Sequence, residues 1–145
     1  MTEYAALGTA FAIGDSATVA TANYTNIAQI RNISGPSMSS DPIDVTSHDS
    51  TNGYREFVVA LKDMGEITLD LIYDPDQATH ANSSGGLFYE YTQATKKAYR
   101  LTLVDTSPTT IKFQAYVTAF NPTNNFDGSM DAAVTLKITG APTIA

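Results

Sequence analysis

The chain has 145 residues, a length that favours one domain. Its 15 acidic and 8 basic residues give a net charge of −7, which argues against a free-standing nucleic-acid-binding protein because such a protein needs a basic surface. The absence of cysteine excludes disulfides, thiolate metal sites and a cysteine nucleophile. The longest strictly apolar run, residues 57–61, is far shorter than the ~20 residues of a membrane-spanning helix, so no membrane association is expected.

Twenty threonines, eight tyrosines and six phenylalanines favour strands over helices. Alternating apolar residues and turn signals predict one strand segment after another along the chain. The segments are 8–14, 24–34 with a bulge, 54–61, 66–74, 98–105, 110–120 and 130–139. One helix is predicted over about residues 84–97, capped by Ser83 or Ser84. The expected fold is mainly β, an antiparallel β-sandwich or barrel with one flanking α-helix and a long mobile loop.

The long loop is predicted over residues 34–53, a stretch that is almost wholly polar and turn-forming. Its sizeable apolar residues are Met38, Ile43 and Val45. A loop of this length inside a small domain is uncommon and is usually functional or mobile. A polar segment that becomes ordered on a partner is one explanation, and an unimportant connection is the other.

Two polar constellations were weighed as reactive sites. Ser37 with His48 and either Asp44 or Asp49 has the residue types of a hydrolytic triad, but the glycine pattern of a nucleophile elbow is incomplete. Asp74, Asp76 and His80 have metal-binding side chains at a spacing that matches no known metal motif. Solvated loop residues and turn acids explain both groups better, so neither an enzyme nor a cofactor or metal is expected.

Several runs of residues nonetheless resemble one known family, the major tail tube proteins of siphophages. The resemblance covers about residues 10–143 and is a pattern of order and spacing. It lies in residues 41–46 (DPIDVT), 54–57 (YREF), 61–66 (LKDMGE), 116–120 (YVTAF), 133–140 (AVTLKITG) and 142–143 (PT). The same fold is shared with the tubes of contractile tails and of type VI secretion.

The resemblance implies a structural virion protein that forms hexameric rings, which stack into the tail tube that conducts DNA. It implies one tail tube domain over 1–145, with an N-terminal arm at 1–8, the mobile loop at 34–53 and a C-terminal arm at 140–145. The immunoglobulin-like domain that some family members carry at the C-terminus is not expected here. The implied partners are further copies of the chain, a tape-measure protein and a tail terminator, and DNA passes through without specific binding. The implied location is the phage tail, after synthesis in the bacterial host cytoplasm.

Two sets of residues are candidate sites under this hypothesis. The loop is expected to contact the neighbouring ring through Met38, Asp41, Ile43, Asp44, Val45, His48 and Asp49. An acidic lumen would repel the passing DNA, and the candidate lumen acids are Glu56, Glu66, Asp70 and Asp131. The alternative from another functional class is a monomeric β-sandwich binding module, such as an adhesin or a carbohydrate binder. The absence of tryptophan weakens that alternative, because it removes the usual aromatic platform.

Overall fold

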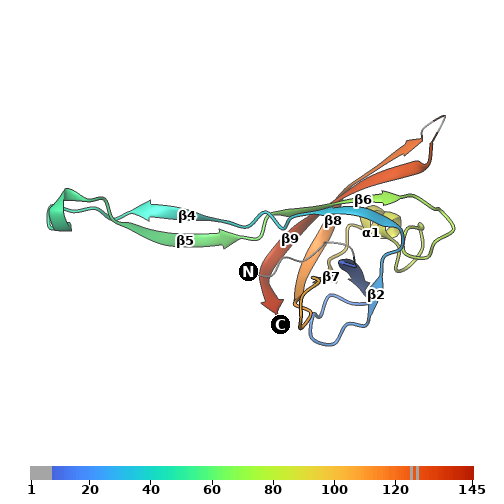
Figure 1. Cartoon of the computed structure of the whole chain (residues 1–145), viewed down its shortest axis with the longest axis horizontal. Helices are drawn as coiled ribbons and strands as arrows, with labels where there is room; N and C mark the ends of the chain where they lie inside the picture. Colours follow the sequence, from blue (N-terminus) through green and yellow to red (C-terminus); the bar gives the residue numbers. More distant parts are fainter. Residues whose placement is uncertain (1–7, 125, 127) are drawn as a thin grey trace.

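The computed structural model describes residues 8–124, 126 and 128–145, and strands dominate it (Figure 1). The predicted N-terminal arm over 1–8 lies, apart from Gly8, outside these residues. In chain order the elements are β1 (Ala10–Gly14), β2 (Tyr24–Asn26), β3 (Ile30–Ser34), β4 (Ser39–Asp44), the 3-10 helix η1 (Thr51–Gly53), β5 (Phe57–Asp63), β6 (Glu66–Ile72), α1 (Leu87–Gln93), β7 (Lys97–Thr102), β8 (Thr110–Asn124) and β9 (Met130–Ile144).

Seven strands form one antiparallel sheet in the order β2-β1-β7-β8-β9-β6-β3, and β4 and β5 pair separately. The two edge strands of this sheet, β2 and β3, are joined by only residues 27–29. Such a short link spans at most about 14 Å, so the sheet must curl until its edges approach each other. The body of the molecule is therefore a rolled, barrel-like sheet, which confirms the expected antiparallel β-sandwich or barrel with one helix.

The interior of the rolled sheet is filled by the alternating apolar residues that the sequence pattern placed on one face of each strand. On β6 these are Ile67, Leu69 and Leu71, all fully buried. Strands β7, β8 and β9 contribute their inward rows to the same core, namely Tyr99, Leu101, Phe113, Ala115, Val117, Ala132, Val134, Leu136 and Ile138. A register shift between Val117 and Ala119 turns Phe120 inward at 9% exposure, so Ala119 does not continue the predicted row.

Two buried polar side chains hold the link between the sheet edges in place. The Ala28 amide donates to Thr79 Oγ1 at 3.2 Å, and the Ala28 carbonyl oxygen lies 2.6 Å from His80 Nε2. The amide of Asp74 donates to Nδ1 of the same imidazole at 3.2 Å, so Nε2 carries the proton and donates to Ala28. His80 and Thr79 thus satisfy the backbone of the link that closes the barrel.

The helix is shorter than the sequence predicted. It begins at Leu87 because Gly85 has a positive φ of 93° and Gly86 is extended, so Ser83 and Ser84 cap nothing. It ends at Gln93, since Ala94 adopts the left-handed conformation, and Lys97 already belongs to β7. The helix lies against β8, where the rings of Phe88 and Phe120 meet edge to face at 5.2 Å.

The chain end is part of the sheet rather than a separate arm. Strand β9 continues to Ile144, which is opposite Ile111 of β8, and the backbones of Thr110 and Ala145 exchange two hydrogen bonds of 2.9 Å. Residues 140–145, the predicted C-terminal arm, therefore extend β9 within the chain, because Thr110, Ile111 and Lys112 of β8 pair with Ala145, Ile144 and Thr143. Their role as an arm at ring contacts stays a prediction.

The predicted loop over 34–53 is also wrong in part. Residues 39–44 form β4, which pairs antiparallel with β5, and Val45 N–H continues the ladder to the Glu56 carbonyl oxygen. This stretch lacks the apolar alternation that marks a half-buried strand because its pairing partner, not a core, holds it extended. Loop conformation is confined to the bend at 35–38 and the outer turn that contains η1.

Candidate self-assembly interface

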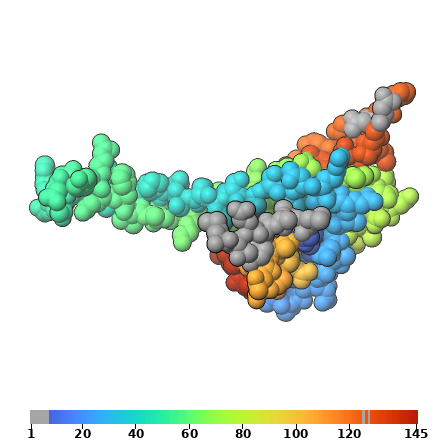
Figure 2. Space-filling view, viewed as in Figure 1, coloured from blue at the N-terminus to red at the C-terminus, as the bar shows by residue number. Residues whose placement is uncertain are grey.

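The most unusual surface of the molecule is the long two-stranded arm formed by β4, β5 and the turn between them. We call residues 39–63 the β4–β5 ribbon. It projects far from the barrel-like body, and no other described segment lies along its outer half (Figures 1 and 2). Its exposed large apolar residues are Ile43, Val45, Tyr54, Phe57, Val58, Val59 and Leu61. Met38, which lies just before the ribbon at its base, is also exposed.

Both faces of the β4–β5 ribbon carry apolar side chains. The register places Ile43 opposite Val58 and Asp44 opposite Phe57. Because successive residues of a strand point to opposite faces, Phe57 and Val59 share one face while Val58 and Ile43 share the other; a register shift between Ser40 and Pro42 interrupts this alternation before Leu61. Leu61 is 86% exposed and Phe57 is 56% exposed. A two-sided apolar strand pair is typical of a segment that is covered on both sides in its functional state.

The two edges of the ribbon differ in their capacity to bind another strand. Val45 N–H points toward β5, so by alternation the nitrogen of Pro42 faces away from it. The outer edge of β4 therefore lacks a donor at Pro42, as protected sheet edges often do. Strand β5 has no proline, and its outer edge has no partner strand among the described residues. The free edge of β5 is open to strand addition.

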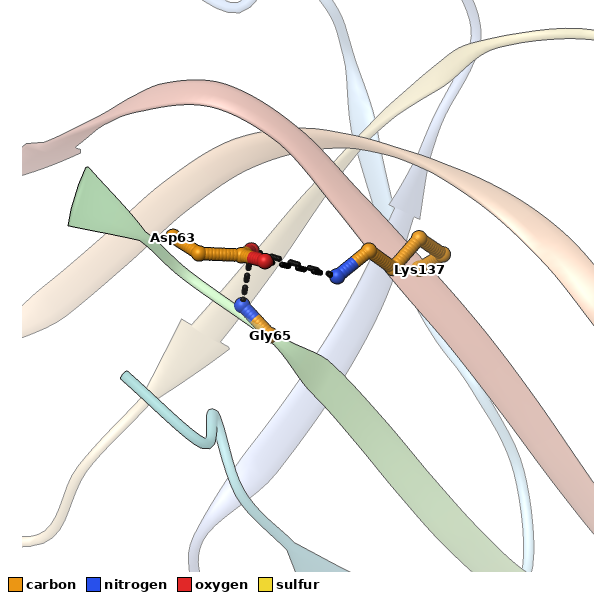
Figure 3. Close-up of polar contacts among 3 residues, drawn as sticks. All are labelled: Asp63, Gly65 and Lys137. Atoms are coloured by element: carbon orange, nitrogen blue, oxygen red, sulfur yellow. Dashed lines mark hydrogen bonds and ion pairs between the residues drawn. The ribbon is translucent and has the colours of Figure 1, made fainter. Parts of the chain in front are cut away.

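A polar clamp sets the direction in which the ribbon leaves the body (Figure 3). A carboxylate oxygen of Asp63 accepts the Gly65 N–H at 2.8 Å, and Lys137 Nζ on β9 lies 3.1 and 3.2 Å from its two oxygens. The Gly65 amide, and then the Lys137 ammonium, lower the pKa of Asp63 below its ordinary value. The Gly65 carbonyl oxygen in turn accepts from Ile138 N at 3.1 Å. Two contacts thus tie the bend to β9, the Asp63–Lys137 ion pair and the hydrogen bond from Ile138 N to the Gly65 carbonyl oxygen.

The bend itself requires glycine at position 65. Gly65 has a φ of +75°, and a Cβ added there would collide with the carbonyl oxygen of Ser37. This close approach is held by the Ser37 amide, which donates to the Glu66 carbonyl oxygen at 3.3 Å. Strands β3 and β6 therefore continue into the ribbon through a bend of defined geometry.

The seven residues predicted to contact a neighbour all lie exposed along β4, the bend before it and the outer turn. The sequence did not identify Tyr54 and the β5 residues Phe57, Val58, Val59 and Leu61 as part of this surface, since residues 54–61 were predicted as a strand of the body. The continuous apolar run at 57–61 was the available signal. Such a run is typical of a strand buried on both faces, and no other described part of the chain covers it.

The candidate lumen acids do not form one group. Glu66, Asp70 and Asp131 lie on β6 and β9 and share the outward face of the body sheet, where Glu66 is opposite Lys137 and Ile72 is opposite Asp131. Asp131 also lies 3.4 Å from Arg31 of β3. Glu56 lies instead at the outer end of the β4–β5 ribbon, where its carboxylate accepts from Ser50 Oγ at 3.1 Å.

The constellations weighed as reactive sites are not assembled. Ser37 lies at the base of the ribbon, while His48 lies in the turn at its far end, with the length of β4 between them. His80 is engaged by Asp74 N and Ala28 O, and the Asp74 carboxylate caps the Asp76 amide at 3.0 Å. Within the described residues, no group of three or more His, Asp or Glu side chains could hold a metal ion.

A helix long and apolar enough to cross a membrane is not found in the described part of the chain.

A family model described as lambda phage tail tube protein matches residues 4–145. Among solved structures, the tail of an empty gene transfer agent particle, refined with C6 symmetry, superposes with a TM-score of 0.75 at 12% identity over 99% of both chains. A chain of the sheath–tube complex of an extracellular contractile injection system has a TM-score of 0.68 and 17% identity, covering 99% of this chain and 93% of that one. The SPP1 tail tube has a TM-score of 0.67 and 11% identity, covering 94% and 75%. No curated protein sequence matches the chain.

Proposed function

Because the chain belongs to the lambda phage tail tube protein family, we propose that its copies form hexameric rings that stack into the tube of a phage tail. The exposed, two-sided apolar β4–β5 ribbon is the observation that carries this proposal, since no other described part of the chain covers it and a large exposed apolar surface is typical of an interface. The C6 symmetry used for the gene transfer agent tail supports six copies per ring.

The ribbon is the proposed contact between neighbouring copies. A head-to-tail contact between two different surfaces closes into a ring or propagates along an axis, depending on its rotation. The ribbon supplies one such surface at one end of the long axis (Figure 1). Its free β5 edge adds a strand to a neighbouring sheet, and its apolar faces exclude water across the contact. The predicted contact residues Met38, Asp41, Ile43, Asp44, Val45, His48 and Asp49 belong to this surface together with the β5 row.

We further propose that the ribbon is mobile in the free subunit and becomes ordered against the next ring. An isolated two-stranded hairpin is at best marginally stable in water, so the ribbon's order depends on the cover that a neighbour provides. The entropic cost of ordering it delays stacking until rings have formed.

The outward face of β6 and β9 is the proposed lining of the lumen. Glu66, Asp70 and Asp131 lie on it, and three carboxylates per subunit repel DNA in a narrow channel. Glu56 is a weaker candidate because it lies on the ribbon. A tape-measure protein within the lumen, a terminator at the tube end and passage of DNA without specific binding complete the proposed role in the virion. A tube structure that turns this face away from the channel would contradict the assignment.

Negative-stain electron microscopy of the concentrated, purified chain tests the proposal. Tubes of uniform width are expected from the wild type, and a variant in which residues 39–63 are replaced by a short turn should give folded subunits without tubes. The doubly substituted F57S/L61S chain should also fail to assemble. Y91S is the matched control, because Tyr91 is an exposed aromatic residue on α1 that lies outside the ribbon. Persistent wild-type monomers, or normal tubes from the ribbon deletion, would contradict the proposal; the former would favour a monomeric binding module.

A further inference from the structure

Two basic residues lie directly opposite each other on neighbouring strands of the body sheet. Residues 94–115 hold four of the eight basic residues of the chain and one acidic residue, a net charge of +3. Within this stretch, Arg100 of β7 and Lys112 of β8 are directly opposite each other. We call these two residues the cation pair. Directly opposed like charges destabilise a sheet unless another group compensates them.

The compensation within the chain is incomplete. The aromatic ring of Tyr24 lies under both charges, with its centroid 5.0 Å from the Arg100 guanidinium carbon and 5.6 Å from Lys112 Nζ. Neither cation lies within ion-pair distance of a carboxylate in the described part of the chain. Arg100 Nε is buried and has no hydrogen-bond partner. Among the described residues, the cation pair therefore lacks the anionic partner that two adjacent positive charges call for.

The β4–β5 ribbon has the opposite charge over all but its last four residues. Residues 39–59 contain four carboxylates and one arginine, a net charge of −3 with His48 neutral. The carboxylates belong to Asp41, Asp44, Asp49 and Glu56, and no basic side chain of the described residues lies within ion-pair distance of any of them. Figure 1 shows the ribbon extending away from the sheet that contains β7 and β8, so it does not cover the cation pair of its own chain.

We propose that the acidic β4–β5 ribbon of one copy docks on the cation pair of another copy. This inference rests on the proposed function and names the surface that receives the ribbon. The apolar side chains of the ribbon supply affinity without direction, whereas complementary charges select the surface and the register of docking. A second copy is favoured over a nucleic acid because this chain itself supplies the acidic, uncompensated partner.

Charge reversal and its rescue test the inference. The body variant carries R100Q and K112E, and the ribbon variant carries D41K and D49K. Each variant should raise the protein concentration needed for tube formation about tenfold, as expected when a few partly exposed charge pairs are lost. The chain that combines all four substitutions should return to within about threefold of the wild type. K96E is the matched control, since Lys96 is exposed, close in sequence and outside the cation pair.

The outcomes separate this inference from the proposed function. A wild type that forms no tubes would contradict the proposed function. Two results would overturn the docking surface alone, provided that the wild type assembles. In the first, the folded body variant assembles at the same concentration as the wild type. In the second, the combined variant is not rescued. Loss of binding to a DNA oligonucleotide in the body variant with unchanged tubes would overturn it in favour of a nucleic-acid contact.

A milder variant keeps the test decisive if the body variant does not fold. K112Q removes one charge and should raise the required concentration about threefold. It should also weaken the dependence of assembly on salt, because one screened attraction is lost. An unchanged salt dependence in K112Q would overturn the inference.

Discussion

Gly65 and Gly53 lie at the two ends of the β4–β5 ribbon and have nearly the same φ, +75° and +74°. An added Cβ would collide with the Ser37 carbonyl oxygen at Gly65 but meets nothing within 4 Å at Gly53. The G65A substitution should therefore lower the free energy of unfolding by about 1–3 kcal/mol more than G53A does, since both share the strain of a positive φ. Urea unfolding of the two variants measures the difference. Equal losses would show that the contact with Ser37 does not constrain the bend.

The Asp63 clamp should make stability depend on pH in the acidic range. Its folded-state pKa is lowered, first by the Gly65 amide and then by Lys137, so its stabilisation is present above the unfolded value of about 3.9. That stabilisation is lost as the pH falls through the lower, folded-state pKa. The difference in unfolding free energy between wild type and D63N should therefore be largest near pH 7 and shrink as the pH falls below the unfolded value. Chemical denaturation at several pH values measures it, and a difference that stays constant would contradict the clamp.

Strands β5 and β6 are continuous in sequence across the bend and nevertheless have opposite environments. Leu61 of β5 is 86% exposed, whereas Leu69 of β6 is fully buried. The L69A substitution should lower the unfolding free energy by about 2–5 kcal/mol, because it leaves a cavity in the core. The L61A substitution should change it by less than about 0.5 kcal/mol in the free subunit. Thermal or urea unfolding measures both, and a large loss from L61A would mean that the ribbon folds back onto the body.

The helix and the chain end show how neighbouring elements override local patterns. The helix was predicted from about residue 84, yet Gly85 and Gly86 take conformations that delay its start to Leu87. Residues 141–144 follow Gly140, which has a positive φ, and still extend β9 because β8 offers partners to Thr143 and Ile144. Each difference from the prediction arises where a distant strand or a glycine determines the backbone conformation.

The whole molecule consists of a well-packed body and an uncovered ribbon, and these two parts should respond differently to assembly. Backbone amides of β5 should exchange with deuterium rapidly in the free subunit and become protected in tubes, because a neighbour then covers them. Amides of β6, which lie between β9 and β3, should be protected in both states. Hydrogen exchange with mass spectrometry, compared below and above the concentration for tube formation, measures this. Equal protection of β5 in both states would contradict a role for the ribbon in assembly.

The sequence by itself determined the β-rich class, the inward rows of the body strands and the family resemblance. Strand alternation reports which face of a strand meets a core, so Ile67, Leu69 and Leu71 could be placed correctly. It also marked residues 34–53 as unusual, although it predicted a loop where β4 pairs with β5.

Only the tertiary structure decided that β5 is not a core strand and that the ribbon stands apart from the body. The local sequence indicates that Phe57, Val58, Val59 and Leu61 prefer an apolar environment. It does not indicate whether the core of this chain or the surface of another chain provides that environment. Likewise, the opposition of Arg100 and Lys112 depends on the register of β7 against β8, which is set by pairing between residues distant in sequence. The net charge of −7 therefore conceals an acidic ribbon and a basic body surface, which become separate features once the chain is folded.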